Sequence, residues 1–142
     1  MESPTVREWM TSDPITVLTG TTLATARSRM EHDEVRRLLV LNESGQLAGV
    51  VTWGDVMAAW PSVYAGLEPV EVRELMARVP VDEVMATDLA TIDPDATMAE
   101  ASNLMFEQRI GALPVVEGGR VVGILTNSDI LQGLVRVLAS QR

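Results

Sequence analysis

Two stretches of the chain carry a threonine and an aspartate at the same spacing. GVVTWGDV (residues 49–56) contains Thr52 and Asp55, and GILTNSDI (residues 123–130) contains Thr126 and Asp129. A carboxylate accepts two hydrogen bonds at once, so each aspartate suits a pair of donors such as the adjacent hydroxyls of a ribose. The helix expected after each threonine presents free backbone N–H groups, which favour a nearby phosphate.

Helix capping accounts for the same residues without a ligand. Threonine is common just before the first turn of a helix, and an aspartate in that turn complements the helix dipole. Trp53 distinguishes the two copies, because its indole could stack on a base or simply fill the first site. The sequence therefore favours ligand contact at Asp129 over Asp55, with capping as the alternative for both.

The remaining residues predict neither an enzyme nor a metal site. The chain has no cysteine, which removes disulfides, thiolate catalysis and cysteine-based zinc sites. Its single histidine, His32, stands in the polar stretch EHDE and is expected to be solvated. A P-loop and a GxGxxG fingerprint are both absent from the sequence. We therefore predict no catalytic residue, no catalytic cofactor and no bound metal.

Charge and hydropathy limit the partners that the chain can have. The formal net charge of −9 opposes nucleic-acid binding, which depends on Lys and Arg contacts with phosphates. No uncharged apolar run reaches the roughly 18 residues of a membrane span, and no basic and then apolar signal segment is recognisable. These features predict a cytoplasmic protein that binds neither nucleic acid nor a membrane.

The two threonine–aspartate stretches belong to a longer internal repeat. The halves align with a shift of 75 residues, which becomes 74 (129 minus 55) once one residue near Ser44 is deleted. Fifteen of the 49 paired positions (residues 6 to 55 less one) are then identical. Random pairing would give about three identities at ordinary residue usage. The repeat is therefore real, and it governs the fold.

Each half is expected to form a strand, a helix, a hairpin of two strands and a closing helix. Helical apolar spacing and a capping box from Thr97 to Glu100 predict the first helix of the second half. Branched apolar runs joined by glycine-containing links predict the hairpins. The segments concerned are ITV and ATI (first strands), RLLVL–NESG–QLAGVV and ALPVV–EGGR–VVGIL (hairpins), residues 54–60 and 128–139 (closing helices), and PSVYAGLEP and VEVRELMARV (a loop and a helical segment between the halves).

The repeated pattern resembles a tandem pair of CBS motifs, called a Bateman module, over nearly the whole chain. RIGALPVVEGGRVVGILTNSDI (residues 109–130) follows the family pattern closely. The first half departs from it at Leu39, where the family usually has proline, and at Trp53-Gly54. The resemblance implies an α/β fold of two β-α-β-β-α motifs with pseudo-twofold symmetry. Motif 1 is expected over residues 1–60, a loop and linking helix over 61–80, and motif 2 over 81–142.

In this family two clefts form between the packed motifs, and adenosine-containing ligands bind there. The resemblance therefore implies a regulatory ligand sensor for AMP, ADP, ATP, S-adenosylmethionine or a relative. The alternative is a structural or protein-interaction module whose clefts have lost their ligand, which Leu39 and Trp53 favour for the first half. In the sensor reading the chain signals to an unidentified regulated protein, or to itself through assembly.

The candidate ligand-binding residues serve three parts of a nucleotide. The threonine–aspartate pairs are expected to bind the ribose. The small residues at the strand start, residues 110–114, leave room for the base, and Pro114 has no N–H with which to close the strand edge there. The resemblance implies that an arginine from the pair Arg36-Arg37 reaches across to the phosphate. Only one of that pair should face the cleft, because neighbouring side chains in an extended segment point to opposite faces. The full set is Thr16, Arg36, Arg37, Thr52, Asp55, Thr91, Ile110, Gly111, Ala112, Leu113, Pro114, Thr126 and Asp129.

The closing helix of the second half carries more apolar residues than one core-facing stripe requires. The resemblance implies that such helices from two modules pack into a flat twofold dimer, so we predict a homodimer with an isologous interface. The residues concerned are Ile130, Leu131, Leu134, Val135, Val137 and Leu138, with Val56, Met57 and Trp60 from the first half.

Overall fold

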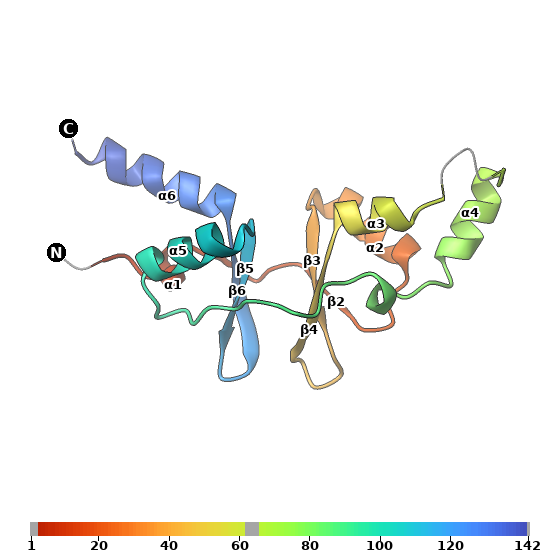
Figure 1. The fold of residues 1–142 in the computed structure, drawn as a ribbon, viewed down its shortest axis with the longest axis horizontal. Helices are drawn as coiled ribbons and strands as arrows, with labels where there is room; N and C mark the ends of the chain where they lie inside the picture. Colours follow the sequence, from red (N-terminus) through yellow and green to blue (C-terminus); the bar gives the residue numbers. More distant parts are fainter. Residues whose placement is uncertain (1–2, 62–65, 142) are drawn as a thin grey trace. The chain divides into compact units, whose positions relative to one another are not determined.

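The computed structural model describes residues 3–61 and 66–141, which fall into two compact units. The terminal unit comprises residues up to Pro14 together with Ala90 onward, and the central unit comprises Ile15–Leu89. The terminal unit contains α1 (Val6–Trp9), β1 (Thr11–Ser12), α5 (Met98–Gln108), β5 (Ala112–Glu117), β6 (Arg120–Thr126) and α6 (Asn127–Ala139) (Figure 1). The central unit contains β2 (Thr16–Leu18), α2 (Leu23–Asp33), β3 (Arg37–Leu41), β4 (Leu47–Thr52), α3 (Trp53–Ala59), α4 (Pro69–Met76) and the 3-10 turn η2 (Val81–Glu83).

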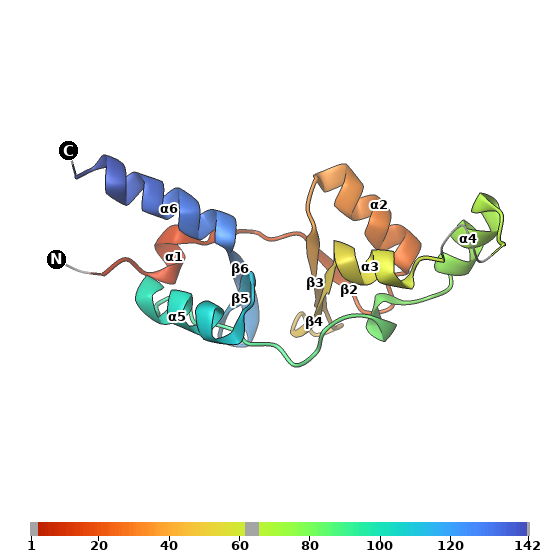
Figure 2. The same cartoon turned by 45° about the horizontal axis from the view of Figure 1, so that its top comes forward.

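The expected mixed α/β fold with repeated β-α-β-β-α elements is confirmed. In the central unit β2 runs parallel to β3, and β3 pairs antiparallel with β4. In the terminal unit β6 lies between β1 and β5 and is antiparallel to both. Helices α2 and α3 lie side by side next to the central sheet (Figure 2). The expected loop PSVYAGLEP lies partly outside the described residues, since residues 62–65 are not among them.

The first strand of the repeat forms in the central unit but is reduced to a single bridge in the terminal unit. In the central unit, Leu39 N–H donates to the Ile15 carbonyl at 3.3 Å, which helps to hold β2. The aligned residue of Leu39 is Pro114, which has no N–H to give to Ala90. Only Ile92 bridges to β5, donating to the Pro114 carbonyl at 3.1 Å and accepting from Val116 N–H at 2.9 Å. The edge of β5, expected to be open at Pro114, is therefore paired with Ile92 through the Pro114 carbonyl and the Val116 N–H. It remains open toward Ala90, where Pro114 has no N–H to donate.

Local sequence signals place the turns and helix starts within a residue or two. The β5–β6 turn consists of Gly118 and Gly119 alone, with φ of 58° and 80°, because Glu117 and Arg120 already pair. Thr97 caps α5 by accepting from Glu100 N–H at 3.1 Å. The reciprocal bond from the Glu100 side chain, expected for a capping box, is not formed within the described residues.

The leading segment of each repeat packs on the other copy of the repeat. Val6, in the first copy, is fully buried in the terminal core, and Val81, in the second copy, is fully buried in the central core. Figure 1 shows α1 beside α5 and α6 within the terminal unit. The side chain of Arg7 donates to Glu117 at 2.6 Å, and this bond raises the pKa of the guanidinium above its usual value. The compact units therefore cut across the sequence ranges 1–60 and 81–142.

Two aligned glycines allow this exchange. Gly49 opens the first threonine–aspartate stretch, and a Cβ there would lie 2.5 Å from Met85 Sδ. Gly123 opens the second stretch, and a Cβ there would lie 2.6 Å from Met10 Sδ and 2.8 Å from the Thr11 carbonyl oxygen. The leading segments thus approach the sheets too closely for any side chain at these positions.

Candidate functional site

The threonine–aspartate stretches form the same helix-starting turn in both units. Thr52 N–H donates to Asp55 Oδ2 at 2.9 Å, and Asp55 N–H donates to Thr52 Oγ1 at 3.1 Å. In the terminal unit, Thr126 N–H donates to Asp129 Oδ2 at 2.8 Å, and Asp129 N–H donates to Thr126 Oγ1 at 3.4 Å. Both aspartates therefore close a capping box, which uses one oxygen of each carboxylate and leaves the other for a different partner.

The second carboxylate oxygen distinguishes the two turns. Thr11 Oγ1 donates to Asp129 Oδ1 at 2.7 Å, and Asp129 is only 7% exposed. Asp55 is half-buried, and its Oδ1 accepts no hydrogen bond from the described residues. The sequence favours Asp129 for ligand contact, whereas these contacts favour Asp55. Thr11 was missed because its role depends on folding, although its alignment with Ala86 does show a hydroxyl in one copy only.

A small pocket of about 140 Å³ lies beside the turn of the central unit. Arg36 and Arg37 line it together with Thr52, Trp53 and Gly54. Arg36 lies in a bend before β3, where strand alternation does not apply, so the expectation that only one arginine faces the site stays a prediction. Trp53 N–H donates to the Arg36 carbonyl at 2.8 Å, which fixes this bend next to the helix start. Neither arginine forms an ion pair within residues 3–61 and 66–141.

The corresponding position of the terminal unit has the same backbone and no charge. Asn127 N–H donates to the Gly111 carbonyl at 3.1 Å, and Ala112 pairs with Thr126. Gly111 and Ala112 are half-buried and small, and the room for a base expected beside them stays a prediction. Leu113 and Pro114 are buried, which leaves their side chains to packing rather than to a surface that a ligand could reach.

The remaining candidates lie on or near the same ends of the sheets. Thr16 begins β2 opposite Leu39, at the end of the central sheet where β3 also begins. Thr91 is exposed and precedes Ile92, the residue that bridges to β5. Ile110 is half-buried and packs against the terminal core. The pocket of the central unit thus brings together Arg36, Arg37 and Thr52 among the predicted residues, and the part expected of Thr16, Thr91 and Ile110 stays a prediction.

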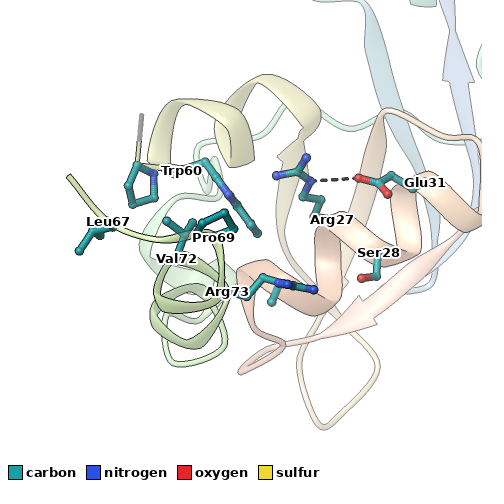
Figure 3. A pocket seen from close by; sticks show the side chains of 10 residues that line it. Arg27, Ser28, Glu31, Trp60, Leu67, Pro69, Val72 and Arg73 are labelled. Carbon is teal, nitrogen blue, oxygen red and sulfur yellow. Dashed lines mark hydrogen bonds and ion pairs between the residues drawn. The ribbon is translucent and has the colours of Figure 1, made fainter. Parts of the chain in front are cut away.

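A larger groove of about 500 Å³ lies on the central unit, between α2, Trp60 and α4 (Figure 3). The side chain of Arg27 lines this groove. Its Nε donates to Glu31 Oε1 at 3.0 Å, and its guanidinium carbon lies 4.5 Å from the ring centroid of Trp60. The same carbon lies 5.7 Å from the ring of Trp53, within cation–π range. Sequence reasoning missed this groove. Its lining residues are Ala24, Arg27, Ser28, Glu31, Trp60, Pro61, Leu67, Pro69, Val72 and Arg73.

The described residues contain neither a metal-binding cluster nor a membrane-spanning helix. Among them, no group of three or more His, Cys, Asp or Glu side chains could hold a metal ion. Within the same residues, no helix combines the length and the apolar character needed to cross a membrane.

The repeated turns and sheets place the chain among known proteins. The family model of the CBS domain matches residues 6–62 and again residues 81–136. The chain belongs to the CBS domain family. The tandem CBS pair predicted from the internal repeat is therefore confirmed, with both copies of the threonine–aspartate turn inside the matched ranges.

Relatives of this CBS pair include proteins of similar length and parts of longer enzymes. A CBS domain-containing protein of Dictyostelium discoideum is 30% identical over 134 residues, which cover 94% of this chain and 92% of that protein. Arabinose 5-phosphate isomerase KdsD of Pseudomonas aeruginosa is 35% identical over 117 residues, which cover 82% of this chain but only 33% of the enzyme. CBS pairs similar to this one thus occur both in CBS-domain proteins of about this size and within enzymes.

Solved structures show the same fold. A Vibrio cholerae protein assigned by name to acetoin utilization (AcuB) has a TM-score of 0.81 at 31% identity, covering 99% of this CBS pair and 96% of that chain. CBSX2, solved in complex with AMP, has a TM-score of 0.77 at 23% identity, with 94% and 98% covered. The CBS pair of MJ0100, solved with 5′-methylthioadenosine and S-adenosyl-L-methionine, has a TM-score of 0.75 at 22% identity, with 99% and 100% covered. At these last two identities the likeness concerns the fold alone.

Proposed function

We propose that this CBS pair is a regulatory module that binds an adenosine-containing ligand, such as AMP, ADP, ATP or S-adenosylmethionine. The observation that carries the proposal is the turn of the central unit, where Asp55 has one oxygen without a partner among the described residues and follows Thr52, Trp53 and Gly54, which line a pocket together with two arginines. Asp55 accepts bonds from the ribose hydroxyls, and Arg36 and Arg37 neutralise a phosphate. The corresponding turn of the terminal unit, with Gly111, Ala112 and Asp129, is the second candidate site.

The size of the arginine pocket fits this division of roles. Whole small-molecule sites usually enclose about 300–1,000 Å³, so a pocket of about 140 Å³ holds one group of a ligand rather than all of it. A phosphate is such a group, and on a chain of net charge −9 it needs local cations. Two structural relatives were solved with adenosine compounds, which supports adenosine as the remainder of the ligand.

Thermal unfolding of the purified chain tests this proposal. We expect stabilisation by at least one of adenosine, AMP, ADP, ATP and S-adenosylmethionine. A ligand present at a hundred times its Kd should add about 2.7 kcal/mol to the free energy of unfolding. GMP is the control, because it keeps the ribose and phosphate and changes only the base. If none of the adenosine compounds stabilises the chain, the sites are degenerate and the interaction-module alternative is favoured.

We also propose that two copies of this chain associate through α6. Five of its apolar residues are between 40% and 64% exposed, whereas its buried positions are Asp129 and Gly133. Val56 of the matching helix α3 is fully buried in the central core, so the part expected of it in the interface is wrong. Met57 and Trp60 are half-buried and also pack on that core. The exposed residues of α6 are Leu131, Leu134, Val135, Val137 and Leu138.

Light scattering is expected to give twice the chain mass of 15.4 kDa at micromolar concentration. The double change Leu134→Asp and Leu138→Asp should give a folded monomer, because two charges one helical turn apart cannot be buried unpaired in an interface. Phe106→Asp is the matched control, since Phe106 is 82% exposed on α5 rather than α6 and should leave the dimer intact. A monomeric parent chain would refute the proposed association.

A regulatory module of this kind acts on another protein or on its own assembly. Within the proposal the ligand alters the equilibrium with that partner and does not undergo a reaction. No residue of either turn is proposed as catalytic.

A further inference from the structure

We infer that the two threonine–aspartate turns are not equivalent: the central unit holds the turn that accepts a ribose, and Thr11 closes the turn of the terminal unit by binding Asp129. The inference rests on the proposed function and adds to it the choice of site and a residue that controls that choice. It is carried by contacts within each unit.

Both carboxylate oxygens of Asp129 already accept hydrogen bonds from the chain itself. Its Oδ2 accepts from Thr126 N–H at 2.8 Å and from Thr126 Oγ1 at 3.0 Å, while its Oδ1 accepts from Thr11 Oγ1 at 2.7 Å. It is also the only charged residue that is buried among those that the structure describes. A ribose hydroxyl approaching Oδ1 would therefore compete with the Thr11 hydroxyl for a carboxylate that is only 7% exposed, and exchanging one hydrogen bond for the other would bring little net gain.

Asp55 lacks this internal partner because the leading segment of the central unit carries an alanine. Ala86 bridges to Val50 in the central unit, and Thr11 pairs with Ile124 in the terminal unit. Val50 and Ile124 are aligned in the repeat, with a shift of 74 (124 minus 50). Ala86 and Thr11 therefore occupy the same register against their sheets, and a hydroxyl is present at only one of the two positions.

The arginines reinforce the same asymmetry. Arg36 and Arg37 line a pocket with Thr52 in the central unit, and their aligned residues in the terminal unit are Gly111 and Ala112. A ligand with both a ribose and a phosphate thus finds two cations in the central unit, together with a carboxylate oxygen that accepts no bond from any described residue. In the other unit it finds a carboxylate that is already bonded and no cation at those positions.

Calorimetric titration with AMP tests the inference, because it measures both affinity and stoichiometry. The parent chain should bind one AMP per chain. Asp55→Asn should raise the Kd for AMP about tenfold or more, which corresponds to the loss of about one hydrogen bond to a charged group. Ala86→Thr should weaken it similarly by placing a hydroxyl on Asp55. Thr11→Val keeps the shape of the side chain but removes the hydroxyl, so this variant should bind a second AMP more weakly than the first. Adding Asp129→Asn to Thr11→Val should abolish the second site.

Thr11→Ser is the control, because it keeps the hydroxyl and should behave like the parent chain with one AMP. Two AMP per parent chain, or parent binding that depends on Asp129 and not on Asp55, would overturn the inference while the proposed function stands. An unchanged single site in Thr11→Val, with the circular dichroism of the parent, would also overturn it. If the parent chain binds neither AMP nor any other adenosine compound, the proposed function itself fails.

Discussion

Replacing Val6 by aspartate is expected to unfold the terminal unit while the central unit keeps its sheet. Val6 is fully buried in a cluster with Leu113 and Leu125, although these two residues stand more than a hundred positions further along the chain. An uncompensated charge there should cost about 4 kcal/mol, because no described neighbour in the cluster can neutralise it. Such a loss is comparable with much of the stability of a small domain.

Hydrogen–deuterium exchange resolves the two units in this experiment. Residues 112–126, which form β5 and β6, should lose protection in Val6→Asp, whereas residues 37–52, which form β3 and β4, should largely retain it. Val81→Asp is the reciprocal variant, since Val81 is fully buried in the central core, and it should reverse the pattern. Val70→Asp changes a valine that is more than half exposed on α4 and should leave both regions protected. Loss of protection over residues 37–52 but not 112–126 in Val6→Asp would show that the leading segments are not exchanged.

Replacing both Arg36 and Arg37 by alanine is expected to weaken AMP binding about tenfold to a few hundredfold and adenosine binding by less than about threefold. The two guanidinium groups line the small pocket beside Thr52, and neither forms an ion pair within the described residues. Each contact with a phosphate contributes about 1.5–3 kcal/mol as a hydrogen bond to a charged group, and the full sum is rarely reached. Adenosine has no phosphate, so its binding does not depend on these phosphate contacts.

The salt dependence of AMP binding provides an independent measure. Screening weakens only the charged part of the interaction, so the dependence on ionic strength should become flatter in the double variant. Arg78→Ala with Arg120→Ala is the matched control: both side chains are exposed, neither lines the pocket, and the net charge changes equally, from −9 to −11 (two cations removed). Equal losses for adenosine and AMP would mean that Arg36 and Arg37 support the fold and not the phosphate.

The sequence by itself was sufficient to predict the repeat, the hairpin and main helices of each copy, and both helix-starting turns. These features depend on residues close together in the chain. Thr52 and Asp55 are three residues apart and bond each other, and Gly118-Gly119 supplies the two positive φ angles of a tight hairpin. Apolar alternation and helical spacing are equally local, which is why the elements of both CBS motifs could be predicted to within a few residues.

Only the tertiary structure decided which segment completes which unit, and hence how the two candidate sites differ. The bond from Thr11 to Asp129 joins residues 118 positions apart, and Val6 and Val81 each pack in the core of the other copy of the repeat. Both copies of the repeat offer an aligned hairpin, β3–β4 or β5–β6, so the apolar pattern of a leading segment does not by itself specify which hairpin it joins. The choice is made by the path of the whole chain, because the energy of such a contact depends on groups that only folding brings together.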